Sequence, residues 1–237
     1  ISFAQGIEQT TVFTGGPVIT VDRDFSEAEA IAIRGNKILA VGNKAMVKSR
    51  AGKNAKIVNL KGKVVMPGFI DPHTHVVAGS VVDSVMEYVG MARFGAVADV
   101  LGHLENLSKE KAAGEWIVVR NFDPSIQTGP NSLTFNELDA VSTQHPIFLL
   151  NASGHLAYAN SKAFEVAQIP ADVKNPPGAE FVRDESGKLN GIMKNNVAFM
   201  QILNKYQALG EVDPTEALIG LVKKWSEFGL TTVSELS

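Results

Sequence analysis

The sequence predicts an α/β fold in two parts, and two features of the chain carry this prediction. Residues 1–68 contain short apolar segments separated by turn residues, a pattern typical of antiparallel strands. Residues 69–237 contain apolar, β-branched segments that alternate with longer stretches of helical spacing. Because parallel strands need a crossover between them, this alternation predicts a parallel sheet with connecting helices.

The first part, residues 1–68, is predicted to be a small antiparallel β-sandwich subdomain. Residues 30–33 and 38–42 flank a Gly-Asn turn and predict a β-hairpin. Residues 56–60 and 63–66 lie on either side of a glycine and predict a second hairpin. Several short strands with frequent turns are typical of a sandwich.

The second part continues the alternation of strands and helices to its last residues. Pro214, directly after Asp213, is a strong signal for the start of a helix. Residues 170–190 are rich in Pro, Gly, Asp and Lys and predict a long excursion or a small hairpin. Strands are predicted at 116–119, 146–150 and 229–233, and helices at 96–108, 160–167, 197–205 and 214–228.

The composition excludes several classes of function and partner. The net charge of −3 and a pI near 6.0 give no electrostatic footprint for nucleic acid. No apolar run is long enough to predict a membrane-spanning helix. The chain has no cysteine, so a metal site would have to use His, Asp, Glu or a modified Lys. Neither nucleic acid nor a membrane is therefore expected as a partner, and homo-oligomer formation stays open.

The first residues leave the compartment open between cytoplasmic and exported. Ser2 and Ala4 place small residues at the −3 and −1 positions of a signal-peptidase cut before Gln5. The absence of cysteine suits a reducing or an oxidising compartment equally well.

His73 and His75 are the strongest candidates for a functional site. They follow an apolar segment that turns at Pro67-Gly68, and side chains two residues apart on a strand point the same way. Two imidazoles on one face can bind one divalent metal ion. The alternative is a pair that faces solvent or hydrogen-bonds in the core. The turn, the apolar strand and the preceding Asp71 favour the metal interpretation.

The sequence VMPGFIDPHTH at residues 65–75 resembles the first-strand motif of the amidohydrolase superfamily. Further segments are similar to the amidohydrolase-3 branch, which includes N-substituted formamide deformylases. They are the Ser-Gly-His and Asn-Ser-Lys-Ala block at 153–163, the Asp-Glu-Ser-Gly stretch at 184–191 and Gly-Leu-Thr-Thr-Val at 229–233. The resemblance extends over nearly the whole chain.

The resemblance implies a TIM-type (β/α)8 barrel with an accessory β-sandwich, and hydrolysis of a C–N bond in an amide, formamide or cyclic amide. It implies one or two divalent ions, most often Zn²⁺, with Fe²⁺, Mn²⁺ or Ni²⁺ as alternatives. His73 and His75 match its metal ligands. Asp71 is expected to hold these two histidines in position without binding the metal itself. A bound metal would lower the pKa of a water molecule and polarise the scissile carbonyl.

Four other residues are weaker candidates. By resemblance, His155 would contact the substrate; the alternative is a histidine satisfied by backbone groups. Asp123 follows a predicted strand and could line the same site, or it could form an Asx-turn with Pro124. Lys194 could be a carboxylated bridging ligand, or it could project into solvent. Glu235, at a strand end, could face the metal.

The predicted barrel looks incomplete, because a complete one needs about 250 residues and only 69–237 are available to it. We therefore expect this chain to be the N-terminal part of a truncated barrel, with the general base and remaining ligands beyond Ser237. The alternative from another class is a catalytically incomplete fragment of the same fold that acts as a binding or assembly module.

Overall fold

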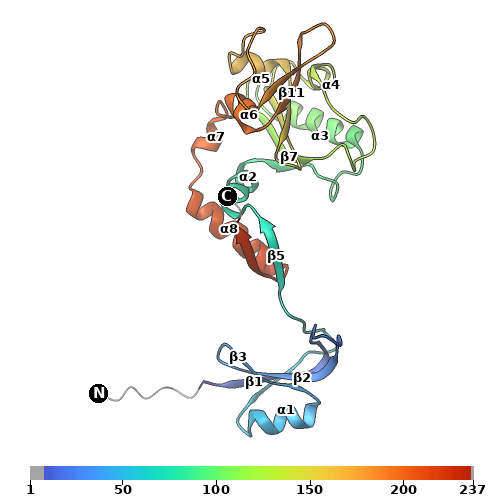
Figure 1. Ribbon diagram of the computed structural model, residues 1–237, viewed down its shortest axis with the longest axis vertical. Coiled ribbons are helices and arrows are strands. Elements are labelled where there is room, and N and C mark those ends of the chain that lie inside the picture. The colour runs from blue at the N-terminus through green and yellow to red at the C-terminus, as the bar shows by residue number, and fades with distance from the viewer. Residues whose placement is uncertain (1–7, 236–237) are drawn as a thin grey trace, which may run out of the picture. The chain divides into compact units, whose positions relative to one another are not determined.

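The computed structural model describes residues 8–235, and the chain divides into two compact units (Figure 1). The first unit runs to Asp71 and includes Gly229–Thr232; the second comprises Pro72–Phe228 and resumes at Val233. The fold is mixed α/β, as the sequence predicts. The signal-peptidase site expected at Ser2 to Gln5 lies outside the described residues.

The first unit contains a four-stranded sheet in the order β3-β2-β1-β4. Strands β1, β2 and β3 form an antiparallel meander, and the predicted hairpin around Gly35 is confirmed as β2–β3. The described residues of this unit also include part of a two-stranded sheet, formed by residues 69–71 and 230–232, and the sandwich stays a prediction. The strands are β1 (Thr10–Ile19), β2 (Glu27–Arg34), β3 (Lys37–Gly42) and β4 (Lys56–Asn59).

The second hairpin predicted for this unit is wrong. Strand β4 pairs with β1 in parallel, and residues 63–66 form no strand with it. The turn after β4 binds back onto β1: the amide of Leu60 donates to Thr14 O at 2.7 Å, and the amide of Gly62 donates to Gly15 O at 2.8 Å. Because these donors are taken by β1, the glycine turn redirects the chain and closes no hairpin.

Helix α1 (Lys44–Ala51) makes the parallel return of β4 possible, and the sequence analysis did not predict it. It begins where the Asn43 side chain accepts a hydrogen bond from the amide of Met46 at 2.9 Å. Val47 and Ala51 pack with Val12 of β1 and form the core of this unit together with alanines of β2 and β3. A helical crossover is what joins parallel strands.

The second unit contains a six-stranded sheet in the order β10-β11-β9-β8-β7-β6. Strands β6, β7 and β8 are parallel, whereas β9 pairs with β8, β11 with β9 and β10 with β11, each time in antiparallel orientation. The predicted strands at 116–119 and 146–150 are confirmed as β7 and β8, and residues 170–190 include most of the β10–β11 hairpin. The strands are β6 (Glu87–Tyr88), β7 (Ile117–Phe122), β8 (Ile147–Asn151), β9 (Leu156–Ala159), β10 (Glu180–Arg183) and β11 (Leu189–Lys194).

The all-parallel sheet expected for this unit is therefore wrong in its second half. Residues 152–155, between β8 and β9, form a tight turn in which the Asn151 side chain accepts from the amide of Ser153 at 2.9 Å. A connection this short leaves no room for a crossover helix, so β9 must run antiparallel to β8. Among residues 8–235 the sheet stays open, with β6 and β10 at its edges, and no closed barrel forms.

The four helices predicted for the second part are confirmed as α3, α5, α6 and α8. Asp213 caps α8 as expected, because its side chain accepts from the amides of Thr215 and Glu216. None of the helices among the described residues is long and apolar enough to span a membrane. The helices of this unit are α2 (Val76–Val85), α3 (Val97–Glu110), α4 (Phe135–Val141), α5 (Ser161–Val166), α6 (Asn196–Leu203), α7 (Gln207–Gly210) and α8 (Pro214–Glu227).

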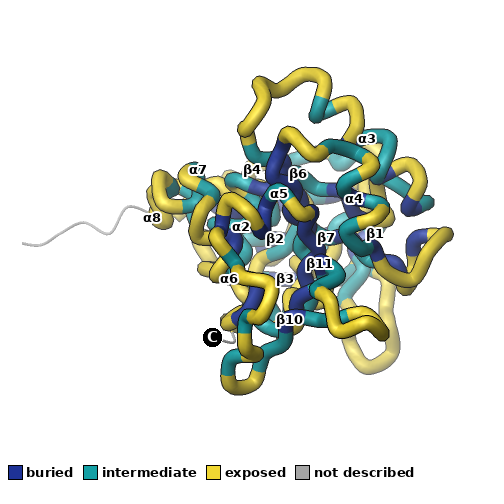
Figure 2. Tube along the Cα trace, turned by 90° about the horizontal axis from the view of Figure 1, so that it is seen from above, coloured by how far each residue is buried: buried dark blue, intermediate teal, exposed yellow. Residues whose placement is uncertain are grey.

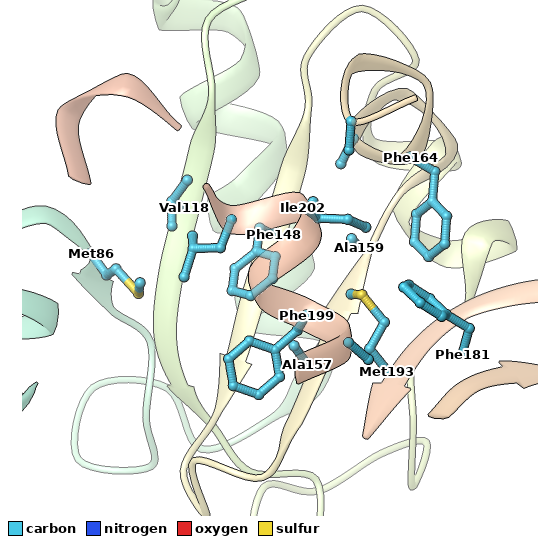
Figure 3. Close-up of a cluster of buried hydrophobic side chains, with 14 residues drawn as sticks. Met86, Val118, Phe148, Ala157, Ala159, Phe164, Phe181, Met193, Phe199 and Ile202 are labelled. Atoms are coloured by element: carbon cyan, nitrogen blue, oxygen red, sulfur yellow. The ribbon is translucent and has the colours of Figure 1, made fainter. Parts of the chain in front are cut away.

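Both faces of the six-stranded sheet are covered by apolar side chains. On one face, Val118 and Phe148 pack with residues of α5 and α6 and of the β10–β11 hairpin (Figure 3). On the other face, Ile117 and Leu149 pack against Leu104 of α3 and residues of α4. Side chains alternate along a strand, so an unbroken apolar run supplies both faces. Figure 2 shows the buried residues along β7 and β11, with the exposed residues mostly in the connecting loops.

Glu87 of β6 gives a testable contribution to stability. Its carboxylate accepts from Arg93 Nη1 at 2.7 Å and lies 2.8 Å from His103 Nε2 of α3. Burial by itself raises the pKa of Glu87, but the hydrogen bonds and charges of Arg93 and His103 outweigh it and hold the pKa below its usual value. A lowered folded-state pKa stabilises the protein above the unfolded-state pKa, near 4.5, and this stabilisation is lost as the pH falls.

We therefore expect Glu87→Gln to lower the urea midpoint at pH 7 and to have a smaller effect at pH 4. Exposed Glu105→Gln on α3 is the matched control and should leave both midpoints close to those of the unsubstituted chain. Equal losses for Glu87→Gln at the two pH values would contradict the electrostatic explanation.

Candidate metal centre

Two strands that are distant in sequence form the support for the histidine pair. β5 (Phe69–Thr74) pairs with β12 (Leu230–Glu235), and the deep red arrow of β12 lies next to β5 in Figure 1. At the start of β5 the amide of Phe69 donates to Gly229 O at 2.8 Å. Gly68 is required there, because a Cβ at this position would lie 2.2 Å from Thr231 Cγ2. The predicted strand at 229–233 is confirmed.

His73 and His75 lie close together at the end of β5, as their spacing predicts. Their ring centroids are 5.8 Å apart and the rings are perpendicular. Two imidazoles that share one tetrahedral ion would hold their ring centres about 5 Å apart, so a small adjustment brings this pair into that range. Both residues are exposed.

Glu235, at the end of β12, is the acidic group beside this pair. Its Oε1 lies 3.9 Å from His75 Nδ1, and its Oε2 accepts from the amide of Val77 at 3.0 Å. The hydrogen bond to the first turn of α2 fixes the carboxylate, and one oxygen remains directed toward His75. Val77 and Glu235 are 158 residues apart in the sequence. The pairing of β5 with β12 therefore brings a carboxylate from a distant part of the chain to the histidines.

Helix α2, which begins directly after His75, is held in place by a charge cluster on Asp83. Asp83 forms ion pairs with Arg120 of β7 and with Lys224 of α8. Arg120 also donates to Met86 O at 3.2 Å and to Asn121 Oδ1 at 2.7 Å, and its guanidinium lies over the Tyr88 ring. These contacts fix the segment that follows the histidine pair to the edge of the six-stranded sheet.

The donor set suits a divalent first-row metal ion. Two imidazoles and a carboxylate are the ligands that zinc and its neighbours accept, and the set contains no thiolate. As they stand in the structure, the residues 8–235 contain no group of three or more His, Asp or Glu side chains arranged to hold a metal ion. His73, His75 and Glu235 therefore form a partial set of candidate ligands, in which Glu235 Oε1 lies 3.9 Å from His75 Nδ1.

Asp71 lies in β5 two residues before His73 and is half-buried. Positions i and i+2 of a strand share a face, so Asp71 is on the same side as His73. Its supporting role stays a prediction.

The other candidate residues make their contacts elsewhere. His155 is exposed in the β8–β9 turn, where its amide donates to Ser153 Oγ at 3.2 Å and its carbonyl accepts from the amide of Asn195. Lys194 forms an ion pair with Glu180 at 2.7 Å across the β10–β11 hairpin, with its side chain half-exposed. This arrangement fits the solvent-facing alternative for Lys194, and its role as a bridging ligand stays a prediction.

Asp123 forms the turn that was the alternative to a site role. Its Oδ1 accepts from the amide of Ser125 at 3.0 Å and from Ser125 Oγ, in the turn that follows β7. The Asp123 charge nevertheless affects the pKa of Tyr158. Burial raises the pKa of Tyr158, the nearby Asp123 raises it further, and a hydrogen bond with the Asn151 side chain opposes both. The phenol is therefore held neutral.

Sequence reasoning did not single out Asn151 or Tyr158 in this cluster. Both are buried, and they lie on the adjacent strands β8 and β9. The available signal was the polar Asn151 directly after an apolar run, a position where barrel-type folds place site residues.

Comparisons with known proteins identify the family of this chain. A family model described as the amidohydrolase family matches residues 56–237, most of the chain. The chain belongs to the amidohydrolase family. The prediction of the amidohydrolase-3 branch is thereby confirmed.

Curated relatives cover nearly the whole chain. An N-substituted formamide deformylase from Arthrobacter pascens is 33% identical over 92% of this chain and 41% of its own length. Protein LONG AFTER FAR-RED 3 from Arabidopsis thaliana is 30% identical over 98% of this chain and 39% of its own length. The chain thus spans about 40% of the length of these two relatives.

A solved structure supports the fold. The chain is similar, with a TM-score of 0.52 and 20% identity, to an uncharacterized metal-dependent hydrolase from Pyrococcus horikoshii. The match covers 97% of this chain and 43% of that protein. At this identity the likeness concerns the fold, and it supports the mixed α/β arrangement described above.

Proposed function

We propose that this chain supplies the first part of the active site of a metal-dependent hydrolase that cleaves the C–N bond of an amide, formamide or cyclic amide. The observation that carries the proposal is the juxtaposition of His73 and His75 with Glu235 at the ends of β5 and β12. Membership of the amidohydrolase family and the likeness to an N-substituted formamide deformylase support it.

In this proposal His73 and His75 hold a divalent ion, with Zn²⁺ as the first choice. When bound, such an ion supplies a water molecule with a lowered pKa and a polarised substrate carbonyl. Glu235 is held by the Val77 amide and directs its second oxygen toward His75, so it is positioned as a further ligand or as an acceptor for His75 Nδ1–H. Asp71 supports β5 at the same site.

We also propose roles for residues outside the histidine pair and for the two larger sheets. His155, on the exposed β8–β9 turn, is proposed to contact the substrate, and Asp123 to line the site through its turn after β7. The parallel β6-β7-β8 segment is proposed to be part of a TIM-type barrel, and the four-stranded sheet of the first unit part of a sandwich. We accordingly propose that residues 1–68 form the sandwich subdomain and residues 69–237 the barrel part.

The test is metal binding followed by hydrolysis with the purified chain. The chain is stripped with a chelator and dialysed against buffered Zn²⁺, and bound metal is measured by inductively coupled plasma mass spectrometry. We expect close to one equivalent of bound zinc. No zinc above the level of a metal-free reference protein would overturn the proposed metal site.

A second candidate function is a binding or assembly module of the same fold. The observation that favours it is the incomplete ligand set, because the described part of the chain holds no group of three metal-binding side chains in place. Release of formate from an N-substituted formamide by the zinc-loaded chain separates the two candidates. Turnover abolished by a chelator supports the hydrolase, whereas a chain that binds no zinc supports the module.

A further inference from the structure

A hollow whose lining includes neither His73 nor His75 lies in the second unit. It has a volume of about 880 Å³ and is bounded by α5, the 169–175 loop and the β10–β11 hairpin. Small-molecule sites in proteins span about 300–1,000 Å³, so this hollow is large enough for a small organic ligand. All of its lining residues belong to the second unit.

The floor of this hollow is apolar and only partly covered. Phe164 packs edge-on against Phe135 at 5.0 Å and against Phe181 at 6.2 Å between ring centroids, and Figure 3 shows Phe164 and Phe181 together beside the hairpin. Ile169 and Leu189 pack against the same core but remain partly exposed. Uncovered apolar surface next to a rigid aromatic pair favours a ligand with an aromatic or branched aliphatic body.

Arg183 fixes the mouth of the hollow. Its Nη1 donates to Ala171 O and Gly187 O, each at 2.9 Å, and its Nη2 donates to Val173 O at 3.0 Å. These bonds join the loop on one side to the hairpin turn on the other, so the mouth is preorganised. A guanidinium has five N–H donors; all three bonds go to carbonyl oxygens, and within residues 8–235 no ion pair neutralises its charge.

The charges around this mouth favour an anion. Lys174 and Lys188 line the hollow with Arg183, and both lysines are exposed. Two carboxylates also line it, but Glu165 is paired with Lys162 at 2.7 Å, outside the lining. The lining thus holds three cations, Asp172 and one paired glutamate, and the charge of Lys188 also interacts with Asp184 outside the lining. A guanidinium binds carboxylates and phosphates by charge-assisted hydrogen bonds, and two of the five N–H donors of Arg183 remain after its three bonds to carbonyl oxygens.

We propose that this hollow binds a small organic carboxylate with an aromatic or branched aliphatic body. The body lies on the apolar floor formed by Phe164, Ile169 and Leu189, and the carboxylate lies at the mouth, near Arg183, Lys174 and Lys188. The site is separate from the metal centre, so it stands or falls independently of the proposed hydrolase activity.

The test is a fluorescence titration of the 237-residue chain with 2-naphthoate, with the neutral 2-naphthamide as the matched ligand. We expect 2-naphthoate to bind at least about tenfold more tightly than 2-naphthamide and its affinity to fall with added salt. Equal affinity for the two ligands would overturn the charge requirement. Complete displacement by equimolar inorganic phosphate would overturn the apolar requirement.

Two pairs of lysine substitutions locate the ligand. Lys174→Gln with Lys188→Gln should weaken 2-naphthoate binding about two- to fivefold for each lysine removed. Lys109→Gln with Lys223→Gln, two exposed lysines of α3 and α8, is the matched control and should leave the affinity unchanged. Both double variants change only exposed side chains and should fold normally. Equal affinity in the two double variants would place the ligand elsewhere and overturn the proposal.

Discussion

Replacing both His73 and His75 with alanine is expected to abolish specific zinc binding by this chain. Supporting residues behind a metal ligand typically change affinity 10–100-fold, so the loss of two ligands should weaken binding by more than about 100-fold. The measurement is equilibrium dialysis of each purified variant against a zinc buffer series, with bound metal quantified by mass spectrometry. Glu235→Gln keeps an acceptor for the Val77 amide but removes the charge, and a loss of about tenfold is expected.

Both histidines are exposed, so the double variant should fold as the unsubstituted chain does. Exposed substitutions away from packed features usually change stability by about 0.5 kcal/mol or less, and the urea midpoint serves as the check. His155→Ala, which removes an exposed imidazole in the β8–β9 turn, is the matched control. Unchanged zinc affinity in the double variant, together with loss in His155→Ala, would move the metal site to that turn.

The sequence was sufficient for features that depend on short-range pattern. The apolar runs that form β7 and β8 supply both faces of a covered sheet. Both could therefore be assigned as strands without knowing which strands pair with them. Asp213 and Pro214 fix the start of α8 through local hydrogen bonds. The spacing of His73 and His75 on one strand places their rings together whatever lies beside them.

Features that depend on connection geometry could not be read in the same way. The segment that became β9 reads as a strand in either direction, and only the tight turn at 152–155 makes it antiparallel. The direction of β4 depends on the helical crossover α1, whose weak amphipathic pattern gave little signal. Pairing between β5 and β12 brings Glu235 beside His75, and no local pattern specifies a partner that far away in sequence.

Helix α2 illustrates a third reason. Its sequence, VVAGSVVDSV, is rich in β-branched residues with low intrinsic helix propensity, and its first turn has no side-chain cap. Its helical form comes from tertiary contacts: it packs against α8, and Asp83 is paired with Arg120 and Lys224. The residues that follow the histidine pair therefore take their conformation from the surrounding fold.

Asn160→Ala is expected to cause the largest loss of stability in the second unit. The side chain is completely buried and makes four hydrogen bonds: Oδ1 accepts from the amides of Ile147 and Ala163, and Nδ2 donates to Ser142 O and His145 O. These bonds join the start of β8 to the start of α5. Alanine leaves three buried backbone groups and the half-buried Ser142 carbonyl without this partner, so we expect a loss of about 3–5 kcal/mol in the free energy of unfolding.

Urea unfolding, monitored by tryptophan fluorescence, measures this loss of stability in the second unit. Both tryptophans, Trp116 and Trp225, lie in the second unit. Asn160→Asp keeps an oxygen acceptor but cannot donate to Ser142 O or His145 O, and it buries a charge, so it should lose at least as much as Asn160→Ala. Exposed Asn131→Ala is the matched control, with an expected change of about 0.5 kcal/mol or less. If Asn160→Ala unfolded at the same urea midpoint as this control, the junction between β8 and α5 would not depend on the Asn160 amide.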